Sequence, residues 1–207
     1  MKRKFLICLL IAGIHNCFAQ GAKETVKDYL IPESSFNNAT FYGVFKTSPF
    51  YRNNRSIYYI DKGNYFDITD AQLYEGEPTA ISTLSVSTSS TEVKMFKSIL
   101  TNPFTTNKVT NYSNPVILLK LPINNLPVKW TSKTIAGDLE YCSAIFSSIT
   151  YKEKTYKAIK VTKTSPDTKI KTIEYYAKGI GLYEVSFLDP STGKTQLIHS
   201  LLKLNFE

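Results

Sequence analysis

Apolar and polar residues alternate along much of this chain, and such alternation is the pattern of half-buried β-strands. It is clearest near the carboxy end, where Tyr183, Val185 and Phe187 are separated by polar residues. A turn containing Pro and Gly follows at 189–193. The apolar face of the returning strand is formed by Ile198, Leu202, Leu204 and Phe206. This segment therefore predicts a β-hairpin at the end of the chain.

The same pattern predicts strands along most of the remaining sequence. Tyr, Phe, Thr, Ile and Val are abundant, and these residues favour strands. A Gly-containing turn at 61–64 joins two aromatic-rich runs, which predicts another hairpin. The further predicted strands are 41–46, 56–61, 65–69, 81–88, 116–121, 139–150, 156–162 and 170–177. Their spacing predicts an antiparallel meander.

Helical spacing is found in one good segment, 89–100. Ser89 and Glu92 can form a capping box there, and the apolar residues that follow share one helical face. A shorter helix is predicted at 22–30. We therefore predict an α+β fold that is mainly antiparallel β: a curved sheet or half-barrel with one or two helices covering one face.

The first nineteen residues have the three parts of a signal peptide. Residues 2–4 are basic, residues 5–14 form an apolar run, and residues 17–19 suit cleavage before Gln20. The apolar run is far shorter than the roughly 20 residues that span a bilayer. We expect export of a single β-rich domain, residues 20–207, that does not span the membrane.

Lipidation at Cys17 is the alternative reading of the amino terminus. The residues around Cys17 resemble a bacterial lipoprotein box, in which small residues stand directly before the cysteine. Here His15 and Asn16 stand before it, and both are large and polar. We therefore expect a periplasmic or secreted protein rather than one that is lipid-anchored at Cys17.

Cleavage of the signal peptide changes the net charge and the cysteine and histidine counts of the mature chain. Cleavage removes three of the 25 Lys and Arg, so 22 basic side chains face 17 acidic ones and the net charge falls from +8 to +5. One cysteine, Cys142, and one histidine, His199, remain. A single cysteine excludes an internal disulfide and favours a bacterial envelope. Because His and Cys are so scarce, we expect no catalytic residue, no metal and no cofactor.

Three residues are each the single one of their type in the mature chain, and the sequence predicts where their side chains lie. Cys142 shares a strand face with Ala144 and Phe146, which predicts a small buried side chain. Trp130 is predicted to anchor the core at the start of a strand. His199 lies on the opposite strand face from the apolar one described above, so we predict that it faces solvent.

The abundance of aromatic residues, 14 Tyr and 12 Phe, points to an apolar binding site. At about 25 cal/mol per Å² of buried apolar surface, an acyl chain sheltered by such side chains is bound without any catalytic group. The predicted lining residues are Phe41, Phe45, Phe96 and Leu100.

Lysines interleaved with tyrosines are concentrated between residues 151 and 175. A basic face can attract anionic head groups or acidic polysaccharide, although lysines also protect sheet edges and keep an outer face soluble. The predicted surface site, called the Lys/Tyr face below, consists of Lys152, Lys154, Tyr156, Lys157 and Lys160. Nucleic acid is not an expected partner outside the cytoplasm.

Residues 174–182, Glu-Tyr-Tyr-Ala-Lys-Gly-Ile-Gly-Leu, resemble a carboxy-terminal signature (YYA-x-GIGL) of uncharacterised secreted or lipid-anchored bacterial envelope proteins. Residues 29–32, Tyr-Leu-Ile-Pro, and Trp130 fit the same pattern. The resemblance covers the last third of the chain. It implies a distant similarity to the periplasmic lipoprotein-carrier architecture, a curved antiparallel half-barrel closed by helices over an apolar cavity. Fewer helices are predicted here than that architecture has.

These observations predict a non-enzymatic exported envelope protein that binds an apolar or amphiphilic ligand, or a protein partner, through a curved β-sheet. A lipid, a lipoprotein or another envelope protein is the expected partner. The alternative is a secreted or surface interaction module that binds polysaccharide or a host protein through the Lys/Tyr face. Salt dependence separates the two, because salt weakens binding to a basic face but does not weaken apolar burial.

Overall fold

The computed structural model of the chain describes residues 23–32, 41–47, 54–74, 77–101 and 107–204. Within these residues a helix of one turn, α2 (Lys27–Leu30), precedes twelve strands. The strands are β1 (Phe41–Thr47), β2 (Asn54–Asp61), β3 (Phe66–Tyr74), β4 (Glu77–Thr88), β5 (Glu92–Thr101), β6 (Lys108–Lys120), β7 (Val128–Lys133), β8 (Leu139–Tyr151), β9 (Lys154–Thr164), β10 (Lys171–Ala177), β11 (Gly181–Leu188) and β12 (Thr195–Leu204).

All twelve strands belong to one antiparallel sheet with the order β6-β5-β4-β3-β2-β1-β12-β11-β10-β9-β8-β7. Every neighbouring pair except one is consecutive in sequence. The sheet therefore consists of two six-stranded meanders, β1–β6 and β7–β12, which are joined where the first strand pairs with the last. The prediction of a mainly antiparallel β fold is confirmed.

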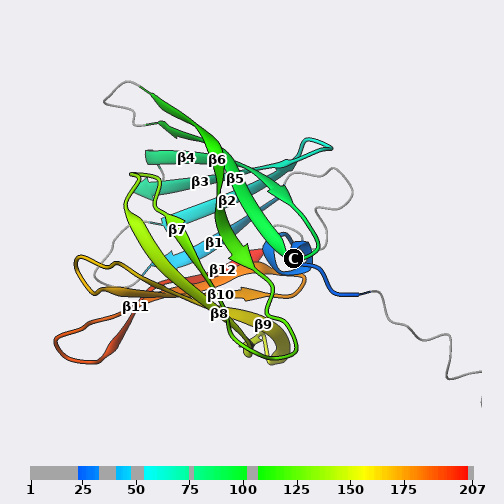
Figure 1. Cartoon of the computed structure of the whole chain (residues 1–207), viewed down its shortest axis with the longest axis vertical. Coiled ribbons are helices and arrows are strands. Elements are labelled where there is room, and N and C mark those ends of the chain that lie inside the picture. The colour runs from blue at the N-terminus through cyan, green and yellow to red at the C-terminus, as the bar shows by residue number, and fades with distance from the viewer. Residues whose placement is uncertain (1–22, 33–40, 48–53, 75–76, 102–106, 205–207) are drawn as a thin grey trace, which may run out of the picture.

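The two edge strands, β6 and β7, approach each other because the sheet bends strongly (Figure 1). Trp130 Nε1 on β7 donates a hydrogen bond of 3.0 Å to the carbonyl oxygen of Ile117 on β6. The described residues of β6 and β7 form no ladder of backbone hydrogen bonds. The edges therefore meet locally at Trp130, whose buried indole confirms the prediction of a core residue.

The predicted helix at 89–100 is wrong, because this segment forms strand β5. It pairs with β4 on one side and with β6 on the other, and Val93 and Met95 are buried at alternate positions. The capping interaction does form, since Glu92 N donates to Ser89 Oγ at 3.0 Å. A second bond, from Ser89 N to Glu92 O at 2.9 Å, makes it a tight turn between strands. Pairing on both edges thus overrides the helical spacing.

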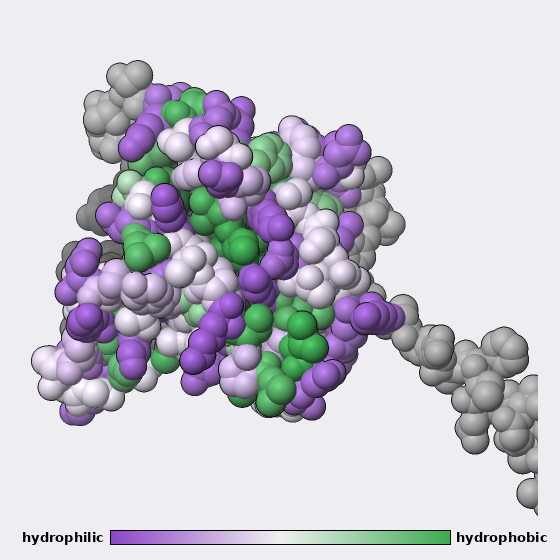
Figure 2. Space-filling view, in the orientation of Figure 1, coloured by the Kyte–Doolittle hydropathy of each residue, from purple (hydrophilic) through white to green (hydrophobic). Residues whose placement is uncertain are grey.

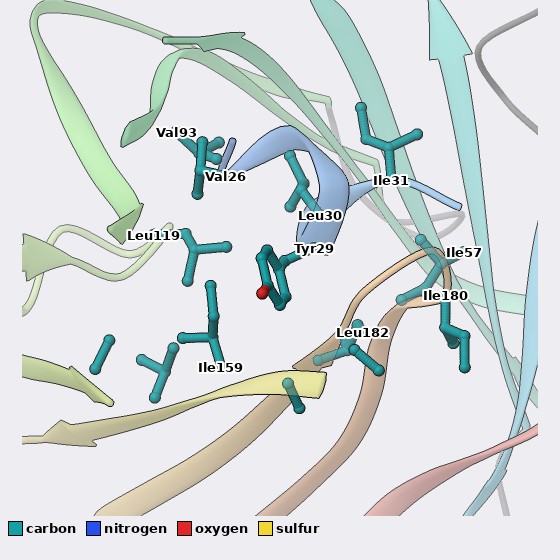
Figure 3. Close-up of a cluster of buried hydrophobic side chains, with 14 of the residues drawn as sticks. Val26, Tyr29, Leu30, Ile31, Ile57, Val93, Leu119, Ile159, Ile180 and Leu182 are labelled. Atoms are coloured by element: carbon teal, nitrogen blue, oxygen red, sulfur yellow. The ribbon is translucent and has the colours of Figure 1, made fainter. Parts of the chain in front are cut away.

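The predicted helix at 22–30 is found in part, as the single turn α2, which is too short to cover a face of the sheet. α2 lies at one end of the curved sheet (Figure 1). Tyr29 points into this end, toward Leu119 of β6 and Ile159 of β9 (Figure 3), and is fully buried.

No helix in the described parts of the chain is long and apolar enough to cross a membrane.

Polar contacts hold the segment around α2 in place. The Glu24 carboxylate accepts hydrogen bonds from Lys157 Nζ at 2.6 Å and Lys178 Nζ at 3.0 Å. Tyr29 also donates its hydroxyl to Glu24, at 3.1 Å. Burial alone would raise the pKa of Glu24, but these three donors lower it to about 2. The carboxylate therefore links the amino-terminal segment to β9 and to the turn after β10.

Candidate functional site

A cavity of about 400 Å³ lies inside the curved sheet. Part of its lining is apolar and comes from α2 and from both meanders: Leu30, Ile57, Leu84, Met95, Leu119 and Leu182. Leu30 belongs to α2, so α2 closes this end of the cavity. The apolar part, called the floor below, lies against the buried core around α2 (Figure 3).

Six charged side chains line the same cavity. Lys133 is exposed to solvent; the other five, which we call the charged ring, are Arg55, Asp70, Glu140, Lys163 and Glu174. They come from β2, β3, β8, β9 and β10. Each occupies an inward position of its strand because side chains of a strand alternate between the two faces of the sheet. On β2, for example, Arg55 alternates with Ile57 and Tyr59, and all three line the cavity.

Arg55 and Asp70 form a bidentate ion pair inside the sheet. Arg55 Nε lies 2.8 Å from Asp70 Oδ1 and 2.9 Å from Oδ2, and Nη2 also donates to Oδ2. Burial alone would lower the pKa of Arg55, but the hydrogen bond and negative charge of Asp70 raise it. Arg55 therefore stays charged, and Asp70 compensates its charge in an ion pair within the cavity wall.

A second ion pair joins β9 to β10. Lys163 Nζ donates to Glu174 Oε1 at 2.7 Å, and the Tyr176 hydroxyl donates to Glu174 Oε2 at 2.7 Å. Burial alone would raise the pKa of Glu174, yet the charge and hydrogen bond of Lys163 lower it. Burial would likewise lower the pKa of Lys163, but Glu174 raises it. This pair is also ionised and internally balanced.

Glu140 is the member of the charged ring that forms no ion pair with any described residue. Burial raises its pKa, and the positive charge of Lys163 offsets this only in part. Ser132 lies directly opposite Glu140 in the β7–β8 register, and both residues line the cavity. One carboxyl group and a neighbouring hydroxyl therefore face the cavity, and no cation of the described residues forms an ion pair with this carboxyl group.

His199 lines the cavity, so the prediction that it faces solvent is wrong. Leu202 is an extra residue in the pairing of β12 with β1, because Lys203 and Leu201 pair with consecutive residues of β1. Such a bulge reverses the alternation, so Leu201 is 7% exposed whereas Leu202 is 47% exposed. Counting back from Leu204 across the bulge gave His199 the wrong face.

The environment of His199 keeps its imidazole neutral. Burial lowers its pKa, and the positive charge of Arg55 lowers it further, to about 4. The Nδ1 atom is buried and has no hydrogen-bond partner among the described residues. His199 therefore contributes a polar but uncharged group to the cavity wall.

A second cavity, of about 410 Å³, adjoins the first and shares Asp70, Gln72, Ser82 and Ile135 with it. Its other lining residues include the exposed Leu100 and Lys108. We call this second cavity the mouth. Its lining residues Asp70 and Gln72 lie farther along β3 from α2 than Ile68, which pairs with Tyr59. On the face drawn in Figure 2, apolar residues form one patch near the middle and another at the lower right, with polar residues between them.

The four predicted lining residues lie in different places. Phe41 and Phe45 lie on β1, opposite Tyr59 and Arg55 of β2; their side chains are outside the described part of the structure. Leu100 lines the mouth. Phe96 packs edge-on against Tyr65, with ring centroids 5.4 Å apart, and does not line either cavity.

The Lys/Tyr face is only partly continuous. Two sets of side chains alternate along β9 and so lie on opposite faces of the strand. One face carries Lys154, Tyr156 and Lys160; the other carries Thr155, Lys157 and the inward Ile159. Lys154 Nζ lies 5.1 Å from the ring centroid of Tyr156, and Lys160 Nζ lies 5.9 Å from that of Tyr175.

Two further lysines of this region differ from these. Lys157 pairs with Glu24 near α2, and Lys152 occupies the β8–β9 turn with φ 47°. The predicted basic surface therefore divides into an outer group on β9 and a lysine that holds the amino-terminal segment.

The charged ring itself was not predicted from the sequence. Lys163 was counted with the surface lysines, although it follows the inward Ile159 and Val161 at alternate positions. The signal that could have identified Lys163 is its position in phase with the apolar residues of the strand. Cys142, in contrast, is buried as predicted, and burial raises the pKa of its thiol to about 12.

Within the described residues, no group of three or more His, Cys, Asp or Glu side chains could hold a metal ion. Comparison of the chain with protein-family models, with curated proteins and with solved structures gives no match. Functional inference therefore rests on the cavity and its lining.

Proposed function

We propose that this protein is a non-enzymatic exported envelope protein whose curved sheet acts as a half-barrel that holds an amphiphilic ligand. The single observation that carries this proposal is the cavity of about 400 Å³, in which an apolar floor adjoins a charged ring. An amphiphile has the same division, with a tail suited to the floor and a polar head suited to the ring. Ligand sites typically enclose roughly 300–1,000 Å³, so the cavity has a suitable size.

The state of the charged groups supports binding rather than catalysis. Arg55 is engaged by Asp70, and Lys163 is engaged by Glu174. A general acid or base works best with a pKa near the operating pH, whereas the pKa of His199 is lowered to about 4. The ring is therefore better suited to hold a polar group than to transfer protons at neutral pH.

The setting proposed for this activity is the periplasm or the outside of the cell. It rests on the signal peptide predicted at 1–19, which lies outside the described residues. The expected ligand is a free lipid or the lipid of a lipoprotein, because those amphiphiles are abundant in an envelope.

Native mass spectrometry of the exported, gently purified protein tests the proposal. We expect a lipid-sized adduct that is lost on denaturation. Leu84→Gln places a polar group in the floor and should reduce the adduct, because burying an unpaired amide is unfavourable. Thr83→Gln is the matched control, since Thr83 is the adjacent residue of β4 and its hydroxyl pairs with Thr69 instead of lining the cavity. A clean mass without adduct, or equal loss in both variants, would count against the proposal.

A second candidate function is recognition of polysaccharide or a host protein by the Lys/Tyr face. The observation that favours it is the position of Lys154 over the ring of Tyr156 on β9 and of Lys160 over the ring of Tyr175 on β10. Charge-dependent binding to such a face weakens as salt rises. If captured partners are released by salt while no amphiphile is found, this second function is favoured.

A further inference from the structure

The positive and negative charges of the charged ring do not cancel completely. Arg55 and Asp70 neutralise each other, as do Lys163 and Glu174. His199 adds no positive charge at neutral pH. Glu140 is left as the carboxyl group in the ring without a counter-ion among the described residues.

Other cations near the site do not remove this imbalance. Lys133 and Lys108 line the cavity and its mouth, but both side chains are exposed. Charges in contact with water are strongly screened. The half-buried Glu140 carboxylate therefore still gains from a cation brought next to it by a ligand, because charge-assisted hydrogen bonds are stronger than neutral ones.

We propose that the ligand of this cavity is an amphiphile with a primary ammonium group, and that Glu140 binds that ammonium. This inference rests on the proposed function, because it names the head group of the ligand held there. A primary ammonium carries three N–H donors and no acceptor. The Glu140 carboxylate and the Ser132 hydroxyl, which are cross-strand neighbours, provide acceptors for them.

An anionic head group fits the same wall less well. Lys163 would attract a carboxylate or phosphate, but Glu174 already accepts its hydrogen bond at 2.7 Å. Glu140 and Glu174 would then repel the incoming anion, because like charges at close range disfavour each other. A neutral head group would avoid repulsion but would leave Glu140 without a counter-ion. The ammonium is thus the head group that balances the ring.

The position of the ring also sets the orientation of the ligand. The floor lies at the α2 end, and the mouth lies beyond the ring, with Leu100 and Ile135 in its lining. A tail that passes the mouth first reaches the floor and leaves the ammonium at the level of Glu140.

Isothermal titration calorimetry with three probes of equal chain length tests the inference. The probes are decylamine and decanoate, each used below its critical micelle concentration, and decanol, used below its solubility limit, all at pH 7.5. We expect decylamine to bind about 10-fold or more tightly than decanol, from a charge-assisted hydrogen bond. Decanoate should bind more weakly than decanol.

Glu140→Gln removes the charge and keeps the shape, so it should abolish the preference for decylamine while decanol binding is kept. Retained decanol binding also shows that the variant is folded. Glu184→Gln is the matched control, because burial raises the pKa of that carboxyl too, but it does not line the cavity. It should keep the preference.

The outcomes separate the two proposals. Equal binding of decylamine and decanol, or a preference for decanoate, overturns the role of Glu140 but supports an amphiphile cavity. A decylamine preference that survives in Glu140→Gln also overturns this role. Failure of all three probes to bind overturns both proposals.

Discussion

Gly181 lies against the backbone of Leu30, so closely that a Cβ atom on Gly181 would stand 2.8 Å from the Leu30 carbonyl oxygen. Nearby, Gly179 N donates a 2.8 Å hydrogen bond to the carbonyl oxygen of Asp28. The glycine-containing turn between β10 and β11 is therefore a docking surface for the segment around α2. Two stretches that the sequence associates only by resemblance, 29–32 and 174–182, are in direct contact.

Gly181→Ala should destabilise the protein and loosen α2. The new Cβ meets a backbone oxygen, which cannot rotate away, and the φ of +85° at this position is itself unfavourable for alanine. We expect a loss of about 2–4 kcal/mol in the free energy of unfolding, measured by urea denaturation. Gly63→Ala is the control, because Gly63 has the same φ of +85° but nothing within 4 Å of the added Cβ. Equal losses in the two variants would show that contact with Leu30 is unimportant.

Glu24→Gln should weaken the attachment of the amino-terminal segment. The variant loses the charge that pairs with Lys157 and Lys178. Because these groups are partly exposed, we expect a cost of only about 0.5–1 kcal/mol at pH 7. Chemical denaturation measures the cost, with Glu153→Gln in the exposed β8–β9 turn as the control that should leave stability unchanged.

The pH dependence of this effect has a definite sign. The pKa of Glu24 falls from 4.5 to about 2 on folding. A lowered pKa means that the contribution is complete above pH 4.5 and is lost as pH falls from 4.5 toward 2. The difference between wild type and Glu24→Gln should shrink over that interval; a constant difference would exclude the carboxylate as its source.

Most strands can be predicted from the alternation of apolar and polar residues, because one face of this sheet is buried and the other is exposed to water. The segment 139–150 was predicted almost to its observed bounds of Leu139–Tyr151 for that reason. β5 was missed because Val93, Phe96 and Leu100 also fit a helix, and only the strands on either side decide between the two. Local sequence does not reveal pairing partners that are distant along the chain.

The candidate site was less predictable than the fold, since its charged ring alone is assembled from five strands of both meanders. Asp70 lies on β3, and its partner Arg55 is fifteen positions away, on β2. The partnership depends on the β2–β3 register, which places Ile57 opposite Asp70. Bulges also change which residues face inward, as Leu202 shows for His199. Such irregularities depend on backbone pairing and have no clear signal in one sequence.

Asp70→Asn should be strongly destabilising because it leaves the buried charge of Arg55 without its carboxylate. Breaking one side of a buried ion pair costs about 3 kcal/mol or more. Asp67→Asn is the control, because Asp67 lies on the opposite face of the same strand and accepts a 2.7 Å hydrogen bond from Ser85. We expect the control to cost roughly 0.5 kcal/mol. Urea denaturation of both variants provides the comparison, and equal costs would show that the Arg55–Asp70 pair adds nothing to stability.

His199 should make the protein less stable as the medium becomes mildly acidic. Its pKa falls from 6.5 to about 4 on folding, first because of burial and then because of the charge of Arg55, while Asp70 acts in the opposite direction. Between these two values the unfolded chain binds a proton that the folded chain does not bind. The stability that depends on neutral His199 is therefore complete above pH 6.5 and is lost progressively as pH falls toward 4.

The variant His199→Gln removes this titration and keeps a neutral polar side chain at the cavity wall. Between pH 7.5 and pH 5, wild type should lose on the order of 1 kcal/mol more stability than the variant, a figure reduced for the partial exposure of the ring. Urea denaturation of both proteins at the two pH values gives the difference directly, because every other titrating group is common to both. Parallel losses would mean that the imidazole is protonated as easily in the folded chain as in the unfolded one, and that His199 does not face the low-polarity interior.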